Sequence, residues 1–245
     1  MTDSLQGRYA LITGGGSGIG KAIASRFADE GAHVLICGRT VSTLEKTASE
    51  TNSLFCEVDV SNSDSIKDLA DFIIKKGWGN LDILVNNAGV FKNNSVETCT
   101  EEEWDHIIGT NLKGTYLMSN AFIPMMSKGS SILNISSNLG LRALDNAAAY
   151  CAAKAGVVNL TRSMAIDLAE RIRVNCICPG IVETPMVTNR FDKDSIEYDN
   201  LSKIPALKRL GKPEEIASMA LHLCSSDAKW TTGSIITVDG GQTAD

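Results

Sequence analysis

Two residues in one alanine-rich segment have types and spacing suited to acid–base chemistry. Tyr150 and Lys154 lie in "AAAYCAAKAG", residues 147–156. A spacing of four residues places two side chains on the same face of a helix. A phenol ordinarily titrates near about 10, and a neighbouring ammonium favours its ionised form. The pair therefore predicts a tyrosine that exchanges a proton near neutral pH, although a Tyr and a Lys at a helix edge can also be purely structural.

Two more polar residues are candidates for the same site. Ser137 follows the apolar run "SILNIS" at its carboxyl end, the edge where open α/β sheets bind ligands. Asn111 lies in "GTNLKGTY", and its side chain could serve either in a catalytic site or as a helix cap.

A glycine-rich segment points to a nucleotide. The run "YALIT" leads directly into "TGGGSGIG", which holds Gly14, Gly18 and Gly20 ahead of an amphipathic stretch. Glycines at such a turn let the backbone approach a pyrophosphate, which then faces a helix N-terminus. A flexible turn is the alternative interpretation. The position between a strand and a helix favours a dinucleotide site.

The elements that must hold these residues alternate along the chain. Seven short apolar runs, at 9–13, 33–37, 54–58, 82–86, 131–136, 173–177 and 234–238, are typical of strands buried on both faces. Helical patterns lie between them, at about 18–30, 41–51, 62–76, 101–127 (two helices), 147–170 and 213–225. This rhythm predicts an α/β fold, a Rossmann-like, doubly wound, parallel seven-stranded sheet flanked by helices. We expect one domain over residues 1–245, with a weakly periodic segment at about 180–205 as a substrate lid.

Composition narrows the classes of function. Lys and Arg number 23 against 29 Asp and Glu, a net charge of −6 that disfavours a nucleic-acid partner. The sequence has neither a leader pattern nor a long apolar run, so we expect a cytoplasmic protein that does not insert into membranes. Seven scattered cysteines and three histidines predict neither a disulfide framework nor a metal site.

Five motifs in order resemble the short-chain dehydrogenase/reductase family: "TGGGSGIG", "NNAG" at 86–89, "ISS" ending at Ser137, the Tyr150–Lys154 pair and "PG" at 179–180. The resemblance implies hydride transfer between a nicotinamide and a ketone or secondary alcohol. It implies that Tyr150 is the general acid/base and that Lys154 lowers the phenol pKa and orients the ribose. Ser137 would polarise the substrate carbonyl, and Asn111 would hold a water of a proton relay.

The same resemblance implies which residues contact the cofactor. Beside Tyr150 and Lys154 these are Gly14, Ser17, Gly18, Ile19, Gly20, Arg39, Asp59, Val60, Asn86, Ala88, Gly89, Pro179, Gly180, Val182 and Thr184.

Cofactor choice depends on the end of the second apolar run, "HVLICGRT". An NAD enzyme of the family usually carries an acidic residue there, where this chain has Gly38 followed by Arg39. A guanidinium suits a 2′-phosphate, so NADP(H) is favoured. NAD(H) stays possible, because Ser17 stands where many NADP enzymes have a basic residue.

The resemblance to this family leaves several substrates open and implies an assembly. Lys128 and Arg171 resemble positions at which 3-oxoacyl-[acyl-carrier-protein] reductases dock their acidic partner. A sugar, polyol or other hydroxy-compound dehydrogenase using NAD is the alternative enzyme, and an NADP-binding regulator the non-enzyme alternative. The resemblance also implies a homotetramer.

Overall fold

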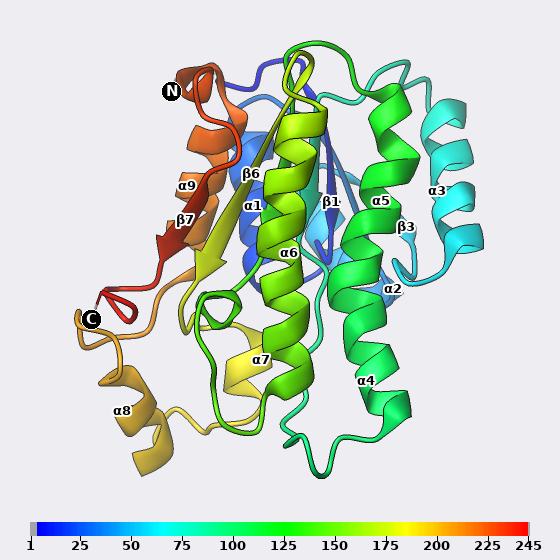
Figure 1. Ribbon diagram of the computed structural model, residues 1–245. Coiled ribbons are helices and arrows are strands. Elements are labelled where there is room, and N and C mark those ends of the chain that lie inside the picture. Colours follow the sequence, from blue (N-terminus) through cyan, green and yellow to red (C-terminus); the bar gives the residue numbers. More distant parts are fainter. Residues whose placement is uncertain (1–3, 245) are drawn as a thin grey trace.

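The computed structural model describes residues 4–244, and its centre is a seven-stranded, all-parallel sheet in the order β3-β2-β1-β4-β5-β6-β7 (Figure 1). This confirms the predicted fold class. The strands are short and lined with apolar side chains on both faces, as a sheet covered by helices on both sides requires. They are β1 (Tyr9–Thr13), β2 (His33–Gly38), β3 (Leu54–Glu57), β4 (Ile83–Asn86), β5 (Ser130–Ile135), β6 (Ile172–Pro179) and β7 (Ile235–Val238).

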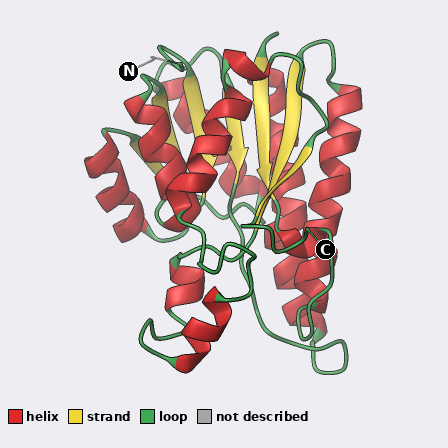
Figure 2. Cartoon of the chain, turned by 90° about the vertical axis from the view of Figure 1, so that its left-hand side faces the viewer, coloured by secondary structure: helices red, strands yellow, loops and turns green. Residues whose placement is uncertain are grey.

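Two helical layers sandwich the sheet (Figure 2). One layer, α1 (Gly18–Asp29), α2 (Val41–Thr51) and α9 (Pro213–Cys224), packs Phe27 and Leu221 into one core cluster. The other layer contributes Leu69 and Phe122 to a second cluster. Burying each such side chain contributes roughly 1.5–3 kcal/mol, so both faces hold the sheet in place. The second layer consists of α3 (Ser63–Lys75), α4 (Glu101–Ile108), α5 (Gly114–Phe122) and α6 (Ala148–Asp167).

The long helical stretch predicted at 101–127 is two α-helices joined by one π-helical turn, Gly109–Lys113. A capping box starts it, because the Thr100 side chain accepts from the Glu103 N–H while the Glu103 carboxylate accepts from the Thr100 N–H. Asn111 lies in the π turn, and its Nδ2 donates to the Ile107 carbonyl of the preceding helix at 2.9 Å. Single π turns inside helices commonly occur at functional sites.

The order in which strands are added reverses at β1. The chain places β2 and β3 on one side of β1 and then places β4 on its other side. The loops after β1 and β4 therefore leave the same edge of the sheet. Thr13 ties them together, because its Oγ1 accepts from the N–H groups of Asn87 and Ala88 at 2.9 Å each. Such a switch point is where open α/β sheets bind ligands.

The segment 180–205 is not a plain loop. It contains the short helices α7 (Pro185–Thr188) and α8 (Ile196–Ser202), which lie beyond the carboxyl edge of the sheet (Figure 2). The Glu183 carboxylate joins its two halves by accepting from the Tyr198 hydroxyl and, at 3.2 Å, from Lys193 Nζ. None of the helices in residues 4–244 is long and apolar enough to cross a lipid bilayer.

Candidate active site

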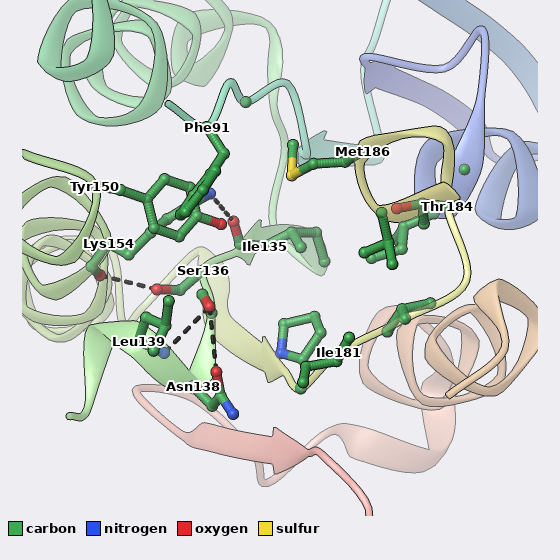
Figure 3. A pocket seen from close by; sticks show the side chains of 18 of the residues that line it. Phe91, Ile135, Ser136, Asn138, Leu139, Tyr150, Lys154, Ile181, Thr184 and Met186 are labelled. Atoms are coloured by element: carbon green, nitrogen blue, oxygen red, sulfur yellow. Dashed lines mark hydrogen bonds between the residues drawn. The ribbon is translucent and has the colours of Figure 1, made fainter. Parts of the chain in front are cut away.

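A cavity of about 900 Å³ opens at the carboxyl edge of the sheet (Figure 3). The loops after β1, β4, β5 and β6 line it, together with the start of α6 and the segment 180–205. Thirteen residues expected at the site border this one cavity: Gly14, Ser17, Gly18, Ile19, Ala88, Gly89, Ser137, Tyr150, Lys154, Pro179, Gly180, Val182 and Thr184.

A second cavity of about 200 Å³ adjoins the first and shares Gly14, Ser17, Ala88 and Gly89 with it. It is lined by three more of the expected residues, Arg39, Asp59 and Val60. The Asp59 pKa is lowered, mainly by hydrogen bonds from Ser61 and further by the charge of Arg39. The two cavities are therefore neighbours along the glycine loop and the loop after β4, and the smaller one carries the Arg39 guanidinium.

The glycine loop fits a dinucleotide. Gly14 and Gly18 have φ values of +66° and +53°, which disfavour any side chain. A Cβ on Gly20 would lie 2.3 Å from the Gly14 carbonyl oxygen, so only glycine lets helix α1 begin this close to the loop. The N-terminus of α1 borders the larger cavity and the Arg39 guanidinium borders the smaller one, an arrangement that fits a phosphate-bearing cofactor.

Tyr150 and Lys154 lie on the first turns of α6, and both are buried, with 8% and 4% of their surface exposed. The Lys154 Nζ is 5.7 Å from the centroid of the Tyr150 ring and donates to the Ile135 carbonyl at 2.9 Å. The Ser136 hydroxyl donates to the Lys154 carbonyl at 2.8 Å and so fixes α6 against the end of β5. The predicted same-face arrangement of this pair is present.

The pKa of the Tyr150 phenol is raised in this structure, whereas we expected Lys154 to lower it. Burial raises the pKa of Tyr150 to about 12, against a weaker, opposite effect of the Ser137 hydroxyl. Burial also lowers the pKa of Lys154 to about 8. Desolvation disfavours the charged form of both groups and is the largest cause of each shift. The ammonium bonds to the Ile135 carbonyl and not to the phenol.

Ser137 lies two residues after the end of β5, where its buried hydroxyl is held by two neighbours. It accepts from the Leu139 N–H at 3.1 Å and lies 3.4 Å from the Asn138 Oδ1, to which it can donate. The side chain thereby caps the short 3₁₀ turn Asn138–Gly140 and keeps its oxygen at the cavity wall beside Tyr150.

Asn111 lies next to the cavity and not in its wall. Its Oδ1 accepts from the Val90 N–H at 3.2 Å, and its Nδ2 donates to the carbonyls of Val90 and Ile107 at 2.9 Å each. A Cβ on Gly89 would come within 2.7 Å of the Asn111 Oδ1 and 3.5 Å of the Lys154 Nζ. Asn111 therefore braces the π turn and the Gly89 loop beside the lysine, so its amide has a structural role whatever its part in proton supply.

Asn86, which we expected at the cofactor site, lies away from both cavities, and its neighbour Asn87 lines the larger one. Asn86 lines neither cavity, because it ends β4 and its Nδ2 donates to Asn134 Oδ1 at 2.9 Å and Ser119 Oγ at 3.0 Å. Asn87 lines the main cavity instead, and its Nδ2 donates to the carbonyls of Thr13 and Gly14 at 2.9 and 3.3 Å. Strand alternation carries the signal that distinguishes them, since the last strand residue faces the helix layer.

Sequence reasoning missed a stack of side chains over the tyrosine. Phe91 packs edge-on against Tyr150, with ring centroids 4.9 Å apart, and the Arg190 guanidinium carbon lies 4.4 Å from the Phe91 centroid. Arg190 also donates to the Phe91 carbonyl at 2.9 Å. No spacing rule connects residues 91, 150 and 190, which come from three separate segments.

Comparison with known proteins identifies the family. A family model described as enoyl-(acyl carrier protein) reductase matches residues 14–243. The 3-oxoacyl-[acyl-carrier-protein] reductase FabG of Thermotoga maritima is 40% identical, covering 97% of this chain and 98% of its own. The NADP-dependent (R)-specific alcohol dehydrogenase of Lentilactobacillus kefiri is 35% identical over 100% of both.

A solved structure agrees with these relatives. The ligand-free aldohexose dehydrogenase of Thermoplasma acidophilum superposes with a TM-score of 0.91 at 35% identity, covering 100% of this chain and 97% of the other. The chain therefore belongs to the short-chain dehydrogenase/reductase family, oxidoreductases that act on hydroxyl or keto groups with NAD(P).

Proposed function

We propose that this chain is an NADP(H)-dependent oxidoreductase that interconverts a ketone and a secondary alcohol, with Tyr150 as general acid/base. The observation that carries the proposal is that Tyr150, Ser137 and Lys154 border the same cavity as the glycine loop. A proton-donating group and a cofactor-binding loop at one cavity are what carbonyl reduction requires.

The roles of the side chains follow from their protonation states. Bound reduced nicotinamide would supply hydride to the carbonyl carbon. Tyr150, whose pKa of about 12 keeps it protonated at neutral pH, donates a proton to the carbonyl oxygen. The Ser137 hydroxyl holds that oxygen through a hydrogen bond. Lys154 is held by the Ile135 carbonyl where it can bind the ribose hydroxyls, and Asn111 keeps the adjoining loop in place.

Arg39 supports NADP(H) over NAD(H). It lines the smaller cavity with Gly38 and Thr40, and β2 ends on Gly38 without the acidic side chain that would accept from a ribose 2′-hydroxyl. A guanidinium there binds a 2′-phosphate through charge and paired N–H donors. We place the remaining cofactor contacts at the residues that line the two cavities. We also propose that the chain forms a single domain and that the segment 180–205 is its substrate lid.

A second candidate is an NAD-dependent dehydrogenase of sugars, polyols or other hydroxy compounds. The structural likeness to an aldohexose dehydrogenase favours it. The Thermotoga relative's name keeps an acyl-carrier-protein thioester among the substrates of the first candidate, with Lys128 and Arg171 as docking residues. We further propose a cytoplasmic homotetramer. An NADP-binding regulator would bind the cofactor without turnover.

One assay separates these candidates. Purified protein is given acetoacetyl-acyl-carrier protein or a free ketone with NADPH or NADH, and D-glucose with NADP⁺ or NAD⁺, while cofactor absorbance is followed. Stoichiometric NADPH oxidation with a carbonyl substrate, lost in Tyr150→Phe, supports the proposal. Faster sugar oxidation with NAD⁺ identifies the second candidate, and tight NADPH binding without turnover of any substrate supports the regulator.

A further inference from the structure

The charged residues that line the main cavity are all basic. They are Arg142, Lys154 and Arg190, and no aspartate or glutamate of residues 4–244 lines it. The chain as a whole carries a net charge of −6, so this distribution runs against its composition. A cavity with one sign of charge and low-dielectric walls concentrates ligands of the opposite sign.

Arg190 lies close to the reacting centre. Its guanidinium lies over the Phe91 ring, which in turn packs edge-on against Tyr150, so one aromatic ring separates the cation from the proton donor. One of its N–H groups is used by the Phe91 carbonyl. A guanidinium carries five N–H donors, so other donors remain for a further acceptor.

No carboxylate within residues 4–244 forms an ion pair with this arginine or with Arg142. Three other arginines do form ion pairs with carboxylates: Arg8, Arg26 and Arg209. The acidic residue of the segment that leads to Arg190, Glu183, is engaged by Lys193 and Tyr198. Both cavity arginines therefore keep their charge available.

The cofactor does not account for these two cations. Its phosphate sites in our proposal are the glycine loop and the smaller cavity, and neither Arg142 nor Arg190 lines the latter. Arg142 belongs to the segment between β5 and α6, and Arg190 follows α7. Both segments border the part of the cavity that is otherwise apolar, lined by Leu144, Met186, Val187, Phe191, Leu201 and Ile204.

We infer that the substrate is a ketone with an apolar body and an oxyanion, a carboxylate or a phosphate, which Arg190 and Arg142 bind. This inference rests on the proposed function and specifies its substrate class. The arginine fork matches the paired oxygens of either anion. Because Arg190 stacks on Phe91 beside Tyr150, binding the anion there brings the carbonyl of a short substrate to the phenol.

Matched substrates test the inference. The rate constant kcat/KM with NADPH is measured for 4-oxopentanoate against its methyl ester, and for dihydroxyacetone phosphate against dihydroxyacetone. Each pair differs in the oxyanion, so a preference for the anion of about tenfold or more is expected in at least one pair. A preference only in the first pair assigns a carboxylate, and one only in the second assigns a phosphate.

Two variants link the preference to the arginines. Arg190→Gln and Arg142→Gln should each lower the ratio of anion to neutral kcat/KM, and Arg190→Lys should restore part of it. The matched control is Arg162→Gln, an exposed arginine of α6 that lines neither cavity. It should leave both members of each pair unchanged.

A binding measurement gives a readout that does not depend on turnover. Calorimetric titration of 4-oxopentanoate, or of dihydroxyacetone phosphate, into the NADP⁺ complex should show a Kd that rises about tenfold in Arg190→Gln and increases with salt. Equal rates and equal binding for anion and neutral partner in the wild-type protein would overturn the inference. If neutral ketones are reduced in a Tyr150-dependent way, the proposed function survives that result. If NADPH binds and Tyr150→Phe turns over as fast as wild type, the proposed function itself fails.

Discussion

Lys154 reaches toward Tyr150 without bonding to it. Its Nζ lies 5.7 Å from the phenol ring centroid and donates to the Ile135 carbonyl at 2.9 Å. The lysine is thereby fixed by the sheet, and the tyrosine is left as a neutral, buried phenol with a pKa of about 12. This state suits the reductive direction, in which the phenol must have a proton to give.

Replacing Tyr150 by Phe removes that proton donor and little else. Because the ring still packs against Phe91, we expect the fold and NADPH binding to persist while kcat falls roughly 10²–10⁴-fold, the usual contribution of a general acid. Steady-state kinetics and NADPH fluorescence titration measure the two effects. Tyr116→Phe, at an exposed tyrosine of α5, is the control and should behave as wild type. A Tyr150→Phe enzyme with near-normal turnover would remove the tyrosine from the mechanism.

Lys154 makes stability depend on pH with a defined sign. Its pKa is about 8 in the folded protein against the ordinary 10.5, so between these values the unfolded chain binds a proton that the folded chain does not. The contribution of this group to the free energy of unfolding therefore rises by on the order of 3 kcal/mol between about pH 8 and about pH 10.5. The raised pKa of Tyr150 acts in the opposite direction, and only above about pH 10.

Lys154→Met removes this dependence. Urea unfolding of wild type and variant at a series of pH values should show a stability difference that shifts in favour of wild type as the pH rises through this window. The variant lacks the donor to the Ile135 carbonyl, which offsets the pH profile by about 1 kcal/mol without changing its slope. A difference that stays flat across the window would mean that Lys154 titrates at its ordinary pKa.

The fold was predictable because burial on both faces gives parallel strands a distinct pattern. β1, with Ala10, Leu11 and Ile12 all fully buried, is an uninterrupted apolar run. The glycine pattern also located the edge of the sheet at which a nucleotide would bind, because Gly20 lies so close to Gly14 that a Cβ has no room. Helical spacing placed Tyr150 and Lys154 on one face. Each of these predictions depends on neighbours within one turn or one strand.

What could not be predicted depends on contacts between distant segments. The stack of Arg190, Phe91 and Tyr150 joins three parts of the chain that have no common period. The pKa of Tyr150 depends on how deeply the tertiary structure buries the ring, which a sequence spacing does not reveal.

Arg39 controls cofactor selection in our proposal, and Arg39→Gln tests it. Loss of a charged hydrogen-bonding partner for a 2′-phosphate should raise KM for NADPH roughly 10–100-fold, since such bonds contribute about 1.5–3 kcal/mol. KM for NADH should barely change, because NADH lacks the 2′-phosphate. Lys46→Gln, an exposed cation on α2, is the control for a simple change of net charge. An equal effect on both cofactors, or none on either, would leave Arg39 as a surface cation.

Gly89 lines both cavities and lies next to Asn111 and Lys154. A Cβ there would lie 2.7 Å from the Asn111 Oδ1, and Asn111 cannot move away, since it is buried and its amide is bonded to Val90 and Ile107. Gly89→Ala should therefore destabilise the protein by about 1–3 kcal/mol and weaken NADPH binding, as overpacking costs of this size are usual. Thermal unfolding with and without NADPH measures both effects. Gly79→Ala is the control, because its Cβ would meet nothing within 4 Å. If Gly89→Ala binds NADPH as wild type does, the loop after β4 has more room than this geometry allows, and its place beneath the cofactor would have to be abandoned.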